Sequence, residues 1–87
     1  MEFRKIVLKK QAEEDILYFK KINLKKVERI KQLLRDIQES PFSGIGKPEP
    51  LRHDLAGCWS RRIDQEHRLV YRVGQKAIEI LQCRYHY

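Results

Sequence analysis

Hydrophobic and polar residues follow a helical period in the first half of the chain and a shorter period in the second half. Residues 3–8 alternate weakly and predict a first strand. In residues 11–22 and 24–38, apolar side chains recur every three or four positions, the spacing of one face of a helix. Asn23 between them is suited to cap a helix, and so short a connection predicts an antiparallel helical hairpin. The apolar positions are Ala12, Ile16 and Phe19, followed by Leu24, Val27, Ile30, Leu33, Leu34 and Ile37.

The segment from Ser40 to Pro50 interrupts this pattern, since it holds all three prolines and two of the four glycines. That composition predicts a loop with a binding role. Beyond the loop the period becomes that of strands, with Ala56-Gly57 and Gly74-Gln75 as hairpin turns. We expect these strands at residues 51–55, 58–64, 67–73 and 77–85.

This order of elements predicts a single α+β domain over residues 1–87. The helix pair should cover one face of a largely antiparallel sheet, and the C-terminal half should supply about four of its strands.

Charge narrows the class of partner. Lysine and arginine number 19 against 12 acidic residues, a net charge of +7 that favours nucleic acid, an anionic surface or an acidic protein. Six of the nine arginines lie in residues 44–87, which indicates that this half carries the function. The two cysteines lack metal-type spacing, and no signal peptide or membrane-length apolar run is visible, so we expect a reduced, cytoplasmic chain without a membrane partner.

Glu49 is the first candidate catalytic residue, because Pro48 and Pro50 flank it and stiffen the backbone. A carboxylate held in one direction suits a general base. The alternative is that Glu49, two residues after Lys47, is an ordinary exposed loop glutamate.

Arginines of the later strands are the second candidate group. Alternation places Arg68 on one face of its strand and Leu69 and Tyr71 on the other, core face. The first face would bring Arg62, Arg68 and Arg84 together as a site for an anion, unless they are simply solvated. Glu66, two residues before Arg68, is placed to orient it. The single tryptophan, Trp59, favours a core or interface role over stacking on a base.

The chain as given ends Cys83, Arg84, Tyr85, His86, Tyr87. A guanidinium, an imidazole and two phenols can hold a phosphate, move a proton and stack on a base. The alternative is a basic, aromatic tail that closes the sheet.

Glutamate, histidine and arginines without metal-ligand spacing are the residue set of a metal-free ribonuclease. RNA carries its own nucleophile, the 2′-hydroxyl, so the enzyme needs a base, a cation for the phosphorane and an acid for the leaving oxygen. We see neither a serine nucleophile elbow nor a phosphate-binding glycine loop, and expect no cofactor.

The sequence resembles the YoeB/Txe branch of the RelE-type toxins. The resemblance covers nearly the whole chain and is dense over residues 41–87, at Pro41, Phe42, Gly44, Gly46, Lys47, Pro48, Glu49, Pro50, Leu51, His53, Leu55, Gly57, Trp59, Ser60, Arg61, Arg62, Ile63, Glu66, His67, Arg68, Leu69, Val70, Tyr71 and Cys83–Tyr87. It implies a RelE-like fold and a toxin of a type II toxin–antitoxin pair that cleaves mRNA in the ribosomal A site. It also implies a homodimer, a YefM-like acidic antitoxin and operator DNA bound through the toxin–antitoxin complex.

By position, the resemblance makes Glu49 the general base, Arg68 the transition-state cation and His86 the general acid, with Tyr87 positioning the substrate. Arg62 matches a phosphate-contacting arginine, and Arg52 stands where the family often has lysine. We group Lys47, Arg61 and Arg84 with them as expected RNA contacts.

Two other functions stay open at this point. One is a ParE-like toxin that binds gyrase without cleaving RNA, and the other is a nucleic-acid-binding co-repressor subunit without activity of its own. Glu49, Arg68 and His86 discriminate between them and the nuclease, because a binding module has no chemical need for an acid–base set.

Overall fold

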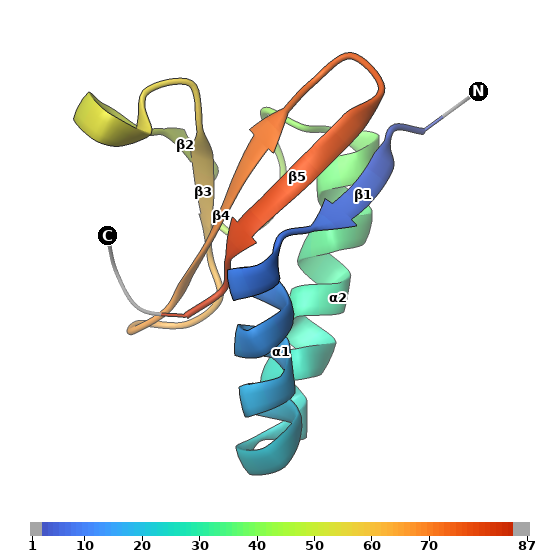
Figure 1. Ribbon diagram of the computed structural model, residues 1–87, viewed down its shortest axis with the longest axis vertical. Helices are drawn as coiled ribbons and strands as arrows, with labels where there is room; N and C mark the ends of the chain where they lie inside the picture. Colours follow the sequence, from blue (N-terminus) through green and yellow to red (C-terminus); the bar gives the residue numbers. More distant parts are fainter. Residues whose placement is uncertain (1–2, 85–87) are drawn as a thin grey trace.

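The computed structural model describes residues 3–84, in which a strand and two helices precede four further strands (Figure 1). The first part comprises β1 (Lys5–Leu8), α1 (Lys10–Ile22) and α2 (Leu24–Glu39). The second comprises β2 (Glu49–Pro50), the short 3-10 helix η1 (His53–Leu55), β3 (Trp59–Arg62), β4 (Arg68–Val73) and β5 (Ala77–Gln82).

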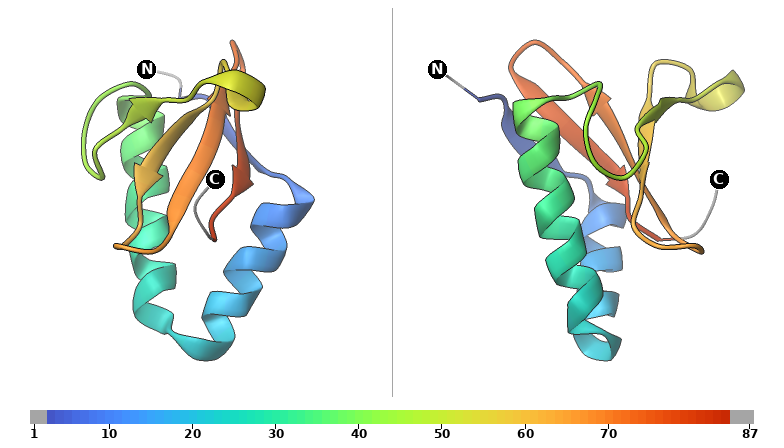
Figure 2. Two further views of the ribbon diagram at one scale, coloured as in Figure 1. Left: turned by 90° about the vertical axis from the view of Figure 1, so that its left-hand side faces the viewer. Right: turned by 180° about the vertical axis from the view of Figure 1, so that it is seen from behind.

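Asn23 separates the two helices in the way its sequence position predicts. Its backbone N–H donates to the carbonyl of Phe19, and its side-chain oxygen accepts from the N–H of Lys25 at 3.1 Å. This side chain therefore caps the start of α2. Figure 2 shows the helices as a V joined at this point, which confirms the predicted hairpin. Leu24 is an exception to the predicted apolar stripe, because it is 68% exposed at the tip of the V.

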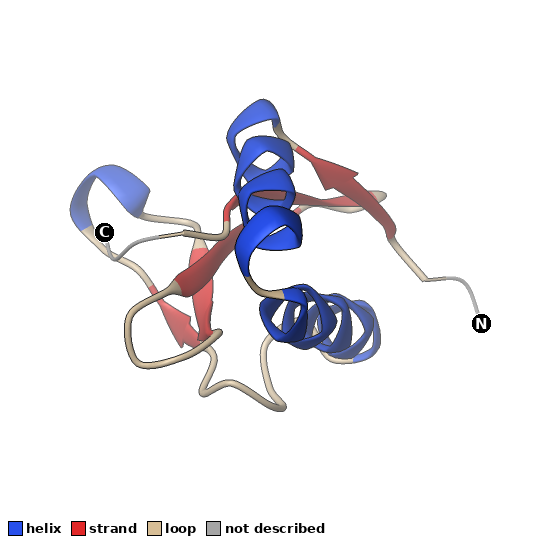
Figure 3. Ribbon diagram, turned by 90° about the horizontal axis from the view of Figure 1, so that it is seen from below, coloured by secondary structure: helices blue, strands red, loops and turns tan. Residues whose placement is uncertain are grey.

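The sheet of the described residues has the order β1-β5-β4-β3-β2 and is antiparallel except between β1 and β5. In Figure 3 the η1 end of the molecule lies on the opposite side from β1. The predicted α+β class is confirmed, and the strand expected at residues 51–55 is wrong. The chain pairs earlier, at Glu49 and Pro50, and then turns into η1, where His53 has a φ of 58° that a strand does not accommodate.

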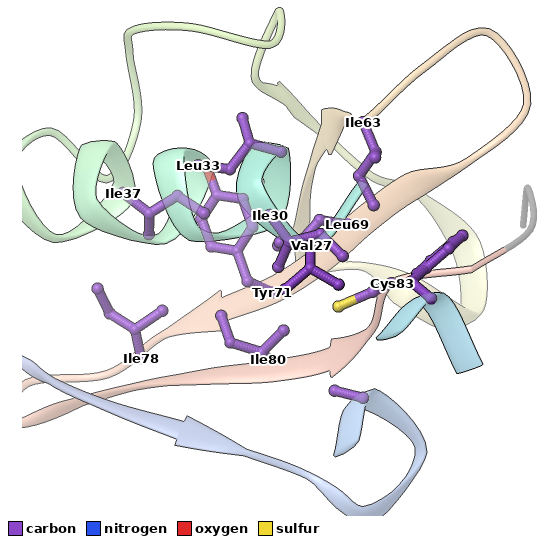
Figure 4. Close-up of a cluster of buried hydrophobic side chains, with 12 residues drawn as sticks. Val27, Ile30, Leu33, Ile37, Ile63, Leu69, Tyr71, Ile78, Ile80 and Cys83 are labelled. Carbon is purple, nitrogen blue, oxygen red and sulfur yellow. The ribbon is translucent and has the colours of Figure 1, made fainter. Parts of the chain in front are cut away.

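The core lies between the helix pair and one face of the sheet. Leu69 and Tyr71 of β4 point into it, as alternation predicts, and Figure 4 shows the Tyr71 ring reaching toward α2. Trp59 is partly buried against this core. The buried members are Ala12, Phe19, Val27, Ile30, Leu33, Ile37, Ile63, Leu69, Tyr71, Ile78, Ile80 and Cys83. None of the helices within residues 3–84 is long and apolar enough to cross a membrane.

Candidate active site

Glu49 lies at the first position of β2, an edge strand of the sheet. It is the Cα partner of Ser60 in β3, so the two side chains share the face opposite the helices. The side chain of Glu49 is 58% exposed, and its Oε1 lies 3.1 Å from Nη2 of Arg68. The carboxylate is therefore open to a ligand and already in contact with a cation.

Arg68 is the buried partner of this ion pair, with 8% of its surface exposed. Its Nε donates to the hydroxyl of Ser60 at 3.0 Å, which fixes one edge of the guanidinium. Nη2 lies within ion-pair distance of Glu49 but makes no well-aligned hydrogen bond to any residue in 3–84. A buried N–H that is held in place and lacks an aligned acceptor can donate a hydrogen bond to an anionic oxygen of a ligand.

Three other predicted RNA contacts lie on or next to β2 and β3. Arg62 is exposed and is the Cα partner of Arg68, so both arginines lie on the same face of the sheet. Arg52 is exposed and lines, with Glu49, an open hollow of about 460 Å³ formed by residues 49–55. Lys47 is exposed immediately before Pro48. The structure thus assembles a carboxylate, one buried guanidinium and exposed cationic side chains at one edge of the sheet.

Arg61 does not fit its predicted role as an RNA contact. It is fully buried, and its guanidinium bonds to Asp36, Tyr71 and the carbonyls of the 40–46 segment. Consecutive strand residues point to opposite faces, so of Arg61 and Arg62 only one can face solvent. The sequence contained this signal, and the expectation of two phosphate contacts there is corrected.

Arg84 and Glu66 also take other partners. The Arg84 guanidinium lies over the ring of Tyr18 on α1, 3.3 Å from its centroid, an arrangement typical of a cation–π contact. Glu66 is exposed and its Oε1 lies 3.4 Å from the ring of His67. The residue that orients Arg68 is Ser60, which sequence reasoning missed.

His86 and Tyr87 lie outside the described residues, so their predicted roles stay predictions. The chain that leads to them is fixed by α1, because the backbone N–H of Cys83 donates to the buried carboxylate of Asp15 at 3.0 Å. Burial, together with Asp15, raises the pKa of the Cys83 thiol to about 12. At neutral pH this sulfur is therefore a packing atom rather than a nucleophile.

The part of the chain described here contains no group of three or more His, Cys, Asp or Glu side chains that could hold a metal ion.

Comparisons with known proteins agree on one family. A family model described as a YoeB-like toxin of bacterial type II toxin–antitoxin systems matches residues 8–87. "Toxin YoeB" of Mycobacterium bovis is 55% identical over 76 residues, 87% of this chain and 89% of that protein. "Toxin YoeB" of Escherichia coli K12 is 46% identical over 83 residues, 95% of this chain and 99% of that protein.

Solved structures give the same result. The YoeB dimer from Staphylococcus aureus superposes with a TM-score of 0.91 at 45% identity, covering 99% of this chain and 100% of that chain. The toxin in a YoeB–YefM complex from the same species gives a TM-score of 0.87 at 46% identity, with the same coverage.

Proposed function

The chain belongs to the YoeB-like toxins of bacterial type II toxin–antitoxin systems, and we propose that it acts as a ribosome-dependent endoribonuclease that cuts mRNA in the A site. The observation that supports this proposal best is the contact between Glu49 and Arg68, an exposed carboxylate 3.1 Å from a buried guanidinium nitrogen. A base beside an anion-stabilising cation is what attack by a 2′-hydroxyl requires.

The proposed reaction uses groups of the chain for each proton and charge. Glu49 accepts the proton of the 2′-hydroxyl as that oxygen bonds to phosphorus. Arg68, oriented by Ser60, holds the negative charge that develops on the phosphorane oxygens. His86 donates a proton to the 5′-oxygen as the P–O5′ bond breaks, with Tyr87 supporting its geometry. The products are a 2′,3′-cyclic phosphate and a free 5′-hydroxyl.

In this scheme no step needs a metal ion, and we propose a metal-independent reaction. The ribosome itself requires Mg²⁺, so the test is thio substitution rather than chelation. Replacing a non-bridging oxygen of the scissile phosphate by sulfur should slow cleavage, and adding a thiophilic ion such as Cd²⁺ should not restore the rate. Restoration by Cd²⁺ would place a metal on that oxygen.

Dependence on the ribosome follows from the openness of the site. Glu49 is more than half exposed, and the hollow beside it is lined by one continuous stretch, residues 49–55. Such a surface cannot by itself hold RNA with the 2′-oxygen, phosphorus and 5′-oxygen in line, an ordering of large kinetic value. Single-turnover cleavage should therefore be far faster on ribosome-bound mRNA than on the same mRNA free in solution. Equal rates would contradict this part of the proposal.

The proposed inhibitor is a YefM-like acidic antitoxin, since the similar S. aureus toxin was solved in a YoeB–YefM complex. The chain carries a net charge of +7 and presents Arg52 and Arg62 beside the Glu49–Arg68 pair. We propose that an acidic segment of the antitoxin folds over this face, and that the complex binds operator DNA. Added salt should slow association more than it speeds dissociation. A complex that left Glu49 and Arg68 accessible would contradict this arrangement.

A homodimer is proposed on the same ground, since a related S. aureus toxin was solved as a dimer. Because ribosomes are the proposed site of action, we also propose a cytoplasmic location. A ParE-like protein that only binds gyrase would not need Ser60 to orient Arg68 toward Glu49. A supercoiling assay discriminates the two, because the nuclease should leave gyrase activity unchanged.

A further inference from the structure

We propose that Arg61 is a positioning residue, whose buried guanidinium fixes the 40–48 loop and thereby places Glu49 against Arg68. This inference rests on the proposed function, since it takes Glu49 to be the base. The residues involved, Arg61, Asp36, Tyr71 and the loop carbonyls they bind, are called the Arg61 network below.

All N–H groups of the Arg61 guanidinium donate hydrogen bonds to partners within the protein. Nη2 donates to the carbonyls of Ser40 at 2.5 Å and Ser43 at 2.8 Å. Nη1 donates to the carbonyl of Ile45 at 3.1 Å and to the carboxylate of Asp36. Nε donates to the hydroxyl of Tyr71 at 3.2 Å. An arginine side chain has five such donors, so none remains for a phosphate.

The partners of Arg61 hold the same loop a second time. The Tyr71 hydroxyl donates to the carbonyl of Pro41 at 2.7 Å, and Asp36 accepts from the N–H of Ile45 at 3.0 Å. Figure 2 shows the loop running from the end of α2 across to β2. Its own backbone forms little regular structure over this span, so side chains of α2, β3 and β4 determine its course.

The loop closes around the guanidinium only because residue 44 lacks a side chain. Gly44 has a φ of +123°, and a Cβ there would lie 2.0 Å from Oδ2 of Asp36 and 3.1 Å from Nη1 of Arg61. A larger residue would have to displace the ion pair or the loop.

The Arg61 network is connected to the site through a short, stiff segment. The carbonyl of Gly46 accepts from the N–H of Arg62 at 2.6 Å, three residues before Glu49. Pro48 and Pro50 then restrict the backbone on either side of Glu49. On β3, Arg61 directly follows Ser60, the residue that orients Arg68. The buried side chain of Arg61 thus fixes the position of the loop before Glu49 relative to β3, the strand whose Ser60 orients Arg68.

The first experiment compares Gly44→Ala with Gly57→Ala. Both glycines have positive φ, but a Cβ at Gly57, where φ is +93°, meets nothing within 4 Å. Gly57→Ala therefore supplies the same kind of backbone strain without touching the Arg61 network. We expect Gly44→Ala to lower the single-turnover rate on ribosome-bound mRNA by roughly 10- to 100-fold at unchanged ribosome affinity. The control should stay within about threefold of wild type.

A double substitution separates positioning from loss of structure. If the Arg61 network acts through Glu49, Gly44→Ala should change the residual rate of the Glu49→Gln variant by less than about twofold. A further fall equal to that seen in the wild-type background would show that Gly44→Ala damages the protein by another route, and would overturn the proposal.

The single tryptophan reports the loop without any assay of cleavage. The ring of Phe42 in the loop packs on Trp59 with centroids 5.1 Å apart. Gly44→Ala should therefore change Trp59 emission and its quenching by acrylamide, and Gly57→Ala should not. Inactive wild-type protein with this fluorescence difference intact would contradict the nuclease and leave the network standing. Unchanged fluorescence in Gly44→Ala would contradict the network itself.

Asp36 offers a second pair of variants if Gly44→Ala fails to fold. Asp36→Asn keeps an oxygen for Arg61 and for the N–H of Ile45, whereas Asp36→Ala removes it. We expect the asparagine variant to retain at least about tenfold more activity than the alanine variant. Equal activity in the two folded proteins would overturn the proposal.

Discussion

The hydroxyl of Ser60 accepts a hydrogen bond from Nε of Arg68 at 3.0 Å, and both residues are buried. This contact fixes the guanidinium, and Nη2 of the same side chain lies 3.1 Å from the carboxylate of Glu49. The orientation of the cation is thereby decided within the sheet, before any RNA binds.

Ser60→Ala should therefore slow cleavage without weakening ribosome binding. Loss of the acceptor leaves Nε of Arg68 unpaired, at a cost of about 1–3 kcal/mol in the free energy of unfolding. We expect the single-turnover rate to fall by about 10- to 100-fold, because a small displacement of the Arg68 guanidinium from the reacting phosphate reduces the rate by about that factor. Gln75→Ala, at an exposed position between β4 and β5, is the control. An unchanged rate for folded Ser60→Ala would remove Ser60 from the mechanism.

Arg52→Ala and Arg62→Ala should act on binding instead. Both side chains are exposed near the Glu49–Arg68 pair, so we expect them to contact phosphates. The affinity for ribosome-bound mRNA falls as salt is added. Each substitution should reduce the magnitude of the slope of log affinity against log salt concentration by about 0.7, the value for one phosphate contact to a single strand. Arg72→Ala is the control, since Nε of Arg72 already donates to Glu79 at 2.9 Å. Slopes equal to that of wild type would exclude these phosphate contacts.

The helical half of the fold was predictable because its signal is local. The apolar stripes and the Asn23 cap are visible in adjacent residues, and both helices form as expected. The sequence does not reveal β2, because two residues carry no period and this strand is defined by its pairing with Trp59 and Ser60. The parallel pairing of β1 with β5 joins the two ends of the chain, which no window of sequence reveals.

The site also combines features that are predictable from local sequence with features that depend on contacts between distant residues. Glu49 and Arg68 could be selected by residue type and by their neighbours, and the structure places them in contact. Residue type alone groups Arg61 with the expected RNA contacts, whereas in the structure its guanidinium is buried and donates to Asp36, Tyr71 and the loop carbonyls. Those partners are spread over the chain, so only the folded structure brings them together.

Alkaline pH should loosen the loop through Tyr71. Burial raises the pKa of Tyr71 above the usual tyrosine value of 10.0, against the opposing effect of Arg61. A folded pKa above the unfolded one means that the stability contributed by this hydroxyl is complete below pH 10.0 and is lost as pH rises through the folded pKa. Tyr71→Phe lacks this contribution at every pH. The difference in Tm between the two proteins should be constant up to about pH 10 and shrink above it. A difference that widens above that pH would contradict the assignment.

His86→Ala tests the leaving-group step. Removing a positioned acid typically costs about 10²- to 10⁴-fold in rate. A 5′-phosphorothiolate at the scissile position has a good leaving group that needs no proton, so it should restore most of the rate lost in His86→Ala. If the variant folds and binds ribosomes but is not rescued, His86 positions the substrate and the acid is another group.

The most direct test of the mechanism uses wild-type protein and two ribosome-bound mRNAs that differ at one atom. One carries the ordinary ribose at the scissile nucleotide and the other a single 2′-deoxyribose. Attack by the 2′-hydroxyl predicts that the first mRNA is cut to a 2′,3′-cyclic phosphate and a 5′-hydroxyl, and that the second is not cut at that position. Cleavage of the deoxy substrate at a similar rate, or products with a 5′-phosphate, would show that water attacks instead and that Glu49 and Arg68 do not perform this chemistry.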